Sequence, residues 1–259
     1  MTKEEFIKKL TSAVATFTDG IQDDNGEWTV KGFIDTDRHI YTISTDTKVV
    51  SKIVELYIFP KIYKFAHDNG LHLELTKEQN FYPDMTFIDQ EGNLFAVDIK
   101  SSYRKNNTSI NGMTLGAFTG YFRERESTKN VTHPYGAYRA HVVLGIIYSL
   151  VEGGDDEFKV YHLENLNDIK SVIKNFIFFV QEKWRIATDR AGSGNTKNIG
   201  SVCNINSLVE GRGPFAELGE NVFDDYWMHY LTKDMARKAE LPGPYYSNLA
   251  EYKIFKRIL

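Results

Sequence analysis

A nearly continuous apolar run, Val142 to Val151, restricts the fold of this chain more than any other feature. Such a run is typical of a strand that is buried within a sheet. It is too short to cross a lipid bilayer, which needs about 20 apolar residues. Hydrophobic residues make up 42% of the 259 residues, enough for a sizeable core. We therefore expect a single α/β domain over residues 1–259, with this run as a buried strand.

Composition excludes several classes of protein. The only cysteine, Cys203, cannot form an intrachain disulfide framework or a cysteine-rich zinc site. The first residues are polar and do not resemble a secretory signal, so we expect an intracellular protein without a membrane partner. The formal net charge of −4 argues at first against nucleic acid. However, residues 100–139 contain seven basic and two acidic side chains, which leaves room for a local DNA-binding surface.

Helical and strand-like patterns surround the apolar run. Thr2 and Glu5 are spaced as a capping box at the start of a helix that ends by Gly20. A second helix is expected to begin at Asp46 or Thr47, to kink at Pro60 and to stop at Gly70. Hairpins are expected at residues 28–43 and 84–100, further strands at 158–161 and 176–180, and a packed aromatic helix at 223–230.

The second of these hairpins carries the most informative residues. In its second strand, Ala96, Asp98 and Lys100 alternate with apolar residues and therefore share one face. If the hairpin closes symmetrically about its five-residue turn, Asp84 lies opposite Asp98, with Cβ atoms about 5 Å apart. Two carboxylates at that separation repel each other unless a cation lies between them.

This arrangement favours a metal site with hydrolytic chemistry. Oxygen ligands prefer Mg²⁺, with Mn²⁺ as an alternative, over zinc. Lys100, two residues after Asp98, could hold an anion or a water molecule beside that cation. Glu55, in the preceding helix, could add a third carboxylate, although a lone glutamate on a helix is more often a surface residue. Together these groups would suit hydrolysis of a phosphodiester.

The pattern Pro83-Asp84…Asp98-Ile99-Lys100 resembles the signature of PD-(D/E)XK nucleases. The resemblance extends over nearly the whole chain to type II restriction endonucleases of this class. It is carried by further short matches in the same order, which are Asp46–Val49, Gln79-Asn80, Thr128–Asn130, Ala191–Thr196 and Asn198–Gly200. Several ordered matches are far more specific than the catalytic signature alone.

The resemblance implies a restriction-endonuclease-like mixed β-sheet core flanked by helices, with a small dimerisation subdomain from segments near 28–43 and 157–165. It implies a cytoplasmic bacterial homodimer that cuts duplex DNA with Mg²⁺, at GATATC and with blunt ends. Asp84 and Asp98 would be metal ligands, Lys100 the catalytic lysine and Glu55 an accessory catalytic and metal-binding carboxylate.

DNA contacts are implied in the same way. Residues 192–196 would form the recognition loop, in which Asn195 could pair with adenine and the Thr196 methyl could contact thymine. The full set of expected DNA-binding residues is Gln79, Asn80, Lys129, Gly192, Ser193, Gly194, Asn195, Thr196 and Asn198. Two alternatives remain open at this point. One is a repair or junction-resolving nuclease of the same fold, and the other is a DNA-binding protein that does not cleave.

Overall fold

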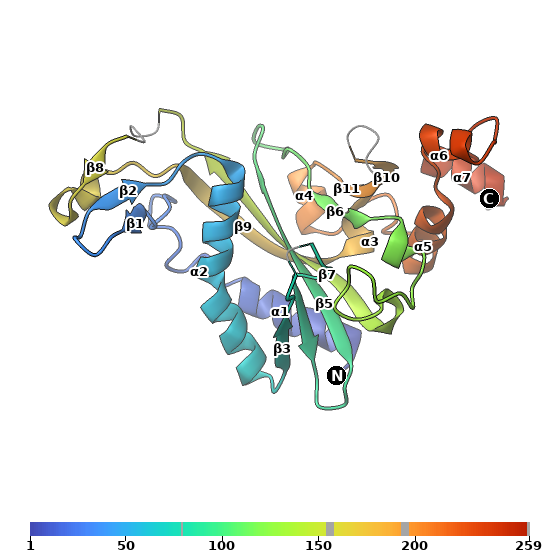
Figure 1. Ribbon diagram of the computed structural model, residues 1–259, viewed down its shortest axis with the longest axis horizontal. Helices are drawn as coiled ribbons and strands as arrows, with labels where there is room; N and C mark the ends of the chain where they lie inside the picture. The colour runs from blue at the N-terminus through green and yellow to red at the C-terminus, as the bar shows by residue number, and fades with distance from the viewer. Residues whose placement is uncertain (79, 154–157, 193–196, 258–259) are drawn as a thin grey trace.

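The computed structural model describes residues 1–78, 80–153, 158–192 and 197–257 (Figure 1). A five-stranded mixed sheet forms its centre. Its strands are β3 (His72–Leu75), β4 (Met85–Ile88), β5 (Leu94–Tyr103), β7 (Tyr138–Leu150) and β9 (Ile173–Glu182). They lie in the order β3-β4-β5-β7-β9, in which β5 and β7 are parallel and the other neighbours are antiparallel. The predicted apolar run is thus a central strand, β7.

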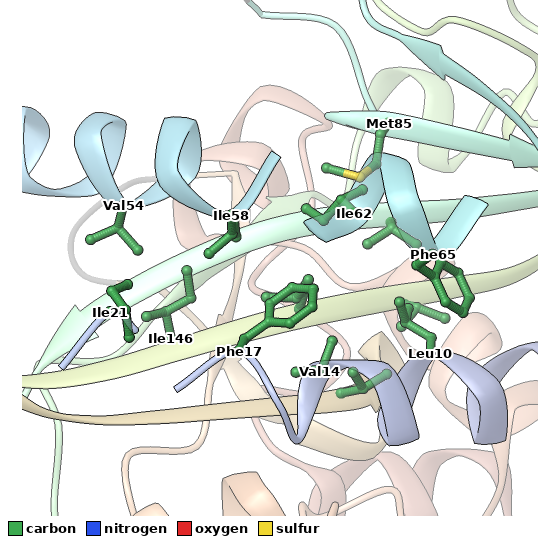
Figure 2. Packing of buried hydrophobic residues seen from close by; sticks show 14 of the residues in the cluster. Leu10, Val14, Phe17, Ile21, Val54, Ile58, Ile62, Phe65, Met85 and Ile146 are labelled. Carbon is green, nitrogen blue, oxygen red and sulfur yellow. The ribbon is translucent and has the colours of Figure 1, made fainter. Parts of the chain in front are cut away.

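Two helices cover one face of this sheet. They are α1 (Lys3–Val14), which begins with the predicted capping box, and α2 (Thr47–Asp68), which is capped by Asp46 and continues through Pro60. Their apolar side chains converge on strand residues such as Met85 and Ile146 to form the first core (Figure 2). The predicted core face of β5, with Phe95 and Val97 fully buried, faces these helices.

A second layer covers the opposite face. It contains a small antiparallel sheet of β10 (Ala187–Ala191), β11 (Asn198–Ser201) and β6 (Thr114–Ala117). The short helix α3 (Lys183–Ile186) leads into β10, and the helices after β11 are α4 (Ile205–Val209), α5 (Glu220–His229), α6 (Lys233–Lys238) and α7 (Leu249–Lys256). Two short 3₁₀ turns, η1 (Gly120–Phe122) and η2 (Tyr135–Ala137), lie between β6 and β7. The predicted aromatic helix is α5, whose aromatic side chains join the second core.

A third, smaller sheet projects at one end of the molecule (Figure 1). Its strands are β1 (Gly32–Ile34), β2 (Ile40–Thr42) and β8 (Val160–Tyr161), and the 3₁₀ segment η3 (Leu163–Asp168) follows them. The predicted 28–43 hairpin is confirmed, because Ile34 pairs with Ile40. Strand β8 is shorter than predicted, and Phe158 lies outside it with its side chain almost fully exposed.

Close packing across β7 fixes the position of the central strands. Gly145 pairs with Lys100 on one side and with Phe179 on the other. A Cβ atom at Gly145 would lie 2.0 Å from Cζ of Phe179, so the aromatic ring occupies the space that a side chain would need. No helix in the described part of the chain is long and apolar enough to span a membrane.

Candidate active site

The β4–β5 hairpin brings Asp84 and Asp98 together as the sequence predicts. Ile88 pairs with Leu94, and Met85 pairs with Val97, so the next opposed positions are Asp84 and Asp98. The backbone N–H of Asp84 lies 3.4 Å from Oδ1 of Asp98, and the backbone N–H of Ile99 donates to Oδ2 of Asp84 at 2.7 Å. The two carboxyl groups are therefore held by the strands themselves.

Lys100 joins the two aspartates on the same face. Its Nζ lies 2.6 Å from Oδ2 of Asp98 and 3.9 Å from Oδ2 of Asp84. Asp98 is the most enclosed of the three, with 9% of its side chain exposed, whereas 40% of the Asp84 side chain is exposed. An acid at the mouth of the site, an acid inside it and a lysine form one continuous cluster.

The electrostatics of this cluster indicate that it is crowded with negative charge. Burial and the nearby charge of Asp98 raise the pKa of Asp84 to about 7, although Lys100 and the Ile99 N–H act in the opposite direction. Burial lowers the pKa of Lys100, but the two carboxylates outweigh this effect, and the net pKa of Lys100 is raised. Lys100 is therefore a cation at neutral pH.

These groups suit a hard divalent cation. Two carboxylates this close also favour a metal ion, because a bound cation relieves their repulsion as a proton on Asp84 does. Their donor atoms are all oxygen, which fits Mg²⁺ or Mn²⁺. Within the described residues, no three acidic, histidine or cysteine side chains form a ligand cluster. The arrangement thus provides two protein ligands and leaves the remaining positions to water or substrate.

The cluster opens into a pocket of about 600 Å³ on the face of the sheet opposite to α1 and α2. Asn80, from the segment predicted to approach DNA, lines this pocket, and so do Tyr82, Gly116 and Tyr121. A larger pocket of about 740 Å³ lies between α1 and α2, but none of the three cluster residues lines it. The aspartate–lysine cluster therefore lies beside the smaller of these two pockets.

Glu55 is placed differently from the other predicted catalytic residues. It lies on α2 and forms an ion pair with Lys52 at 2.8 Å. It lines a neighbouring pocket of about 630 Å³ together with Glu78 and Asp84. Asp84 therefore borders both pockets, and Glu55 reaches the second of them without joining the two aspartates.

The predicted DNA-contact residues are only partly described. Gln79 and residues 193–196 of the recognition loop lie outside the described residues. The flanks of that loop are close together, because the N–H of Gly192 donates to the carbonyl oxygen of Asn198 at 2.9 Å. Lys129 is exposed in the segment before β7. Of the described residues in this set, only Asn80 lines the pocket beside the aspartate–lysine cluster.

The basic segment after β5 is less available than its charge suggests. Arg104 donates to Ser149 and to the carbonyl of Asn175, and Arg123 donates to the carbonyl of Tyr230. Arg125 forms a 2.7 Å ion pair with Asp224. These three arginines therefore bind other parts of the protein, and their side chains are occupied within the fold. Of the seven basic residues, Lys105, Lys129 and Arg139 are the exposed ones.

Sequence reasoning missed a cluster of aromatic and basic residues behind the pocket. Tyr82, Tyr121 and Tyr135 form a stack, and the ammonium of Lys183 lies among aromatic rings beside it. These residues come from segments that are far apart in the sequence. The one local signal is the aromatic content of residues 118–138, which indicates packing but not a pocket.

The segments predicted to form a dimerisation subdomain do come together. Strand β2 pairs with β8 through Tyr41 and Val160, which joins part of the 28–43 segment to the described part of the 157–165 segment, from Phe158 onward. Large apolar side chains are exposed on this sheet. They are Phe33, Ile34, Tyr41 and Val160.

The fold and the site define a class of protein. A mixed sheet whose hairpin presents Asp84 opposite Asp98, with Lys100 two residues further on, is the arrangement expected of a PD-(D/E)XK nuclease. The family model described as "Restriction endonuclease EcoRV" matches residues 24–257. The chain belongs to this family and is a type II site-specific deoxyribonuclease.

Individual proteins are similar to the chain to different extents. It is 37% identical to the type II restriction enzyme EcoRV of Escherichia coli over 236 residues, which cover 90% of this chain and 93% of that enzyme. Among solved structures, it resembles the NlaIV restriction endonuclease with a TM-score of 0.38 and 10% identity, over 93% of this chain and 90% of the other.

Proposed function

We propose that this protein cuts both strands of duplex DNA at a short palindromic site with the help of a divalent cation. The opposition of Asp84 and Asp98 beside Lys100, in a chain of the EcoRV family, is the observation that carries the proposal. The expected site is GATATC with a blunt cut, and Mg²⁺ is the expected ion. These expectations rest on similarity to the Escherichia coli enzyme.

Each member of the cluster has a proposed role. Asp84 and Asp98 would hold the cation. Glu55, which lines the neighbouring pocket that Asp84 borders, would act as an accessory catalytic and metal-binding carboxylate. When bound, the cation would supply neutralisation of phosphate charge and would acidify water. Lys100 would orient the attacking water and offset the charge that develops on the phosphate oxygens. Attack on phosphorus in line with the 3′-oxygen would break that P–O bond and leave a 5′-phosphate and a 3′-hydroxyl.

Sequence recognition is proposed for the loop at residues 192–196. Its flanks are joined by the Gly192–Asn198 hydrogen bond, which would fix where the loop enters the DNA groove. Gln79 and Asn80 would approach the other groove, and Asn80 lines the catalytic pocket. Lys129 is proposed to contact a phosphate, as its exposure allows.

A homodimer is proposed because a palindrome is read by two-fold symmetry. The exposed apolar side chains of the β1-β2-β8 sheet provide a candidate contact surface. Phe33 and Ile34 are 52% and 58% exposed, although side chains of this kind are usually covered. A second copy of the chain would cover them.

Digestion of plasmid DNA, followed by sequencing of the fragment ends, tests the proposal. Discrete fragments with blunt ends within GATATC, formed with Mg²⁺ and not with EDTA, are expected. The Asp98→Ala and Lys100→Ala variants should lose cleavage, whereas the control Lys9→Ala, which removes an exposed lysine on α1 at the opposite face of the sheet, should retain it. Random fragmentation would indicate a repair-type nuclease, and binding to a GATATC duplex without cleavage would indicate a DNA-binding protein.

A further inference from the structure

The wall of the catalytic pocket contains a tyrosine hydroxyl that the cluster of acids and lysine does not include. Tyr121 lies in η1, which follows β6, and it lines the same pocket as Asp98 and Lys100. The charges of both residues act on the Tyr121 hydroxyl, and Tyr121 in turn acts on Lys100. The hydroxyl therefore belongs electrostatically to the catalytic cluster.

Neighbouring rings hold the Tyr121 ring in place. Tyr82 stacks on it with ring centroids 5.3 Å apart and an interplanar angle of 13°. Tyr135 stacks on Tyr121 at 5.8 Å and 27°. Tyr82 is itself fixed, because its hydroxyl hydrogen bonds to Nδ1 of His141 at 2.8 Å. Tyr121 is thus oriented by buried groups that come from three other segments.

A glycine allows the hydroxyl to approach the backbone of β6. A Cβ atom at Gly116 would lie 3.1 Å from the Tyr121 hydroxyl oxygen, and Gly116 has a φ of +98°. The backbone N–H of the next residue, Ala117, hydrogen bonds to the same oxygen. Both features place the hydroxyl at one position in the pocket wall.

The Tyr121 hydroxyl has a proton that it can donate in a hydrogen bond. Burial, with a smaller contribution from the charge of Asp98, raises the pKa of Tyr121 to about 12, so the group is protonated at neutral pH. The Ala117 N–H uses one lone pair of its oxygen but does not accept its proton. Among the residues that the structure describes, no acceptor receives that proton. Because Tyr121 lines the catalytic pocket, a water molecule or a substrate oxygen in that pocket can accept the proton.

We propose that the Tyr121 hydroxyl donates a hydrogen bond to a non-bridging oxygen of the scissile phosphate. This inference rests on the proposed function of the Asp84–Asp98–Lys100 cluster. Tyr121 keeps its proton throughout, and no bond to it is made or broken. Its contribution grows as negative charge accumulates on the phosphate oxygens in the transition state. Tyr121 is then a further catalytic residue, which assists the cation and Lys100.

Replacing Tyr121 by phenylalanine tests this role, because Tyr121→Phe removes only the oxygen atom and retains the ring of the stack. Cleavage of a GATATC duplex would be measured under single-turnover conditions with Mg²⁺, and binding would be measured with Ca²⁺. We expect cleavage to slow by about 10- to 100-fold while the Kd changes by less than about threefold. The matched control is Tyr135→Phe, in the same stack but not in the pocket wall, which should cleave at the normal rate.

A sulfur substitution at the phosphate separates a direct contact from a structural effect. Sulfur accepts hydrogen bonds poorly, so one phosphorothioate diastereomer should already lack the Tyr121 contact. With that diastereomer, Tyr121→Phe should slow cleavage much less than it does with the oxygen substrate. Equal slowing with both substrates, or a normal rate for Tyr121→Phe with the oxygen substrate, would overturn the inference. Normal cleavage by Asp98→Ala would instead overturn the proposed function of the cluster.

Discussion

The ammonium of Lys183 lies 5.3 Å from the ring centroid of Tyr82 and has no hydrogen-bond partner among the described residues. The rings of Phe122 and Tyr135 lie at 5.5 Å and 5.3 Å from it. Only 2% of Lys183 is exposed, and burial lowers its pKa to about 8. The second core therefore contains a positive charge that aromatic faces stabilise only in part.

Lys183→Met should stabilise the protein at pH 7, because it replaces a buried ammonium by an apolar side chain of similar length. The gain should be about 1–3 kcal/mol in the free energy of unfolding, since the ring contacts offset part of the burial cost. Urea unfolding measures it. Because the folded pKa is lowered, the unfolded chain binds more protons between about pH 8 and 10.5. The difference in the free energy of unfolding between the variant and the wild type should therefore shrink as the pH rises through that range. A variant that is less stable at pH 7 would contradict this.

His141 should make the protein sensitive to mild acid. Burial lowers the pKa of His141 well below its usual value, so the folded protein keeps this ring neutral. The unfolded chain binds the proton below about pH 6.5, and this favours unfolding by about 1.4 kcal/mol for each further pH unit. His141→Gln should flatten the decline in stability between pH 6.5 and 5. His67→Gln, which replaces an exposed histidine, should leave the slope unchanged. Equal slopes for His141→Gln and the wild type would refute the assignment.

Gly145→Ala should destabilise the central sheet, because the added methyl group would meet the ring of Phe179 at 2.0 Å. We expect a loss of about 1–3 kcal/mol in thermal or urea unfolding. Gly243→Ala provides the control, since a Cβ atom there meets nothing within 4 Å. Trimming the ring in the double variant Gly145→Ala/Phe179→Leu should cost less than the two single changes together. Strictly additive losses would argue that the two residues do not clash.

Polar substitutions on the β1-β2-β8 sheet should weaken the proposed dimer. Phe33→Ser combined with Ile34→Ser removes two exposed apolar side chains from that surface. Sedimentation velocity at micromolar concentration should show a dimer for the wild type and a folded monomer for the double variant. Ile254→Ser, which alters an exposed residue on α7, serves as the control and should remain dimeric. A wild-type protein that is already monomeric would contradict the proposal that this sheet forms a dimer contact.

Local patterns were sufficient to predict the catalytic hairpin. Its register follows from a five-residue turn and from strict alternation in β5, so Asp84 and Asp98 are opposed as expected. The apolar run was recognisable because β7 is buried on both faces and has few polar positions. Helix caps at Thr2 and Asp46 were equally local. Each of these features leaves a recognisable pattern within a short stretch of the sequence.

The pocket wall could not be predicted in the same way. Tyr82, Tyr121 and Lys183 meet only after three distant segments have folded against one sheet face. The β10-β11-β6 sheet was also missed, because its strands are short and their registers are irregular. The internal bonds of Arg104 depend on the same long-range packing, and net charge alone does not reveal them.

The two aspartates and the lysine of the cluster all lie within the first hundred residues, but the second core, on the same face of the sheet, extends to Tyr252 in α7. That residue is 2% exposed and packs in the same core as the pocket-lining Tyr82. During translation, the hairpin leaves the ribosome long before its cover is complete. A chain truncated before α7 would therefore carry the catalytic residues but would lack part of the second core, to which the pocket-lining Tyr82 belongs.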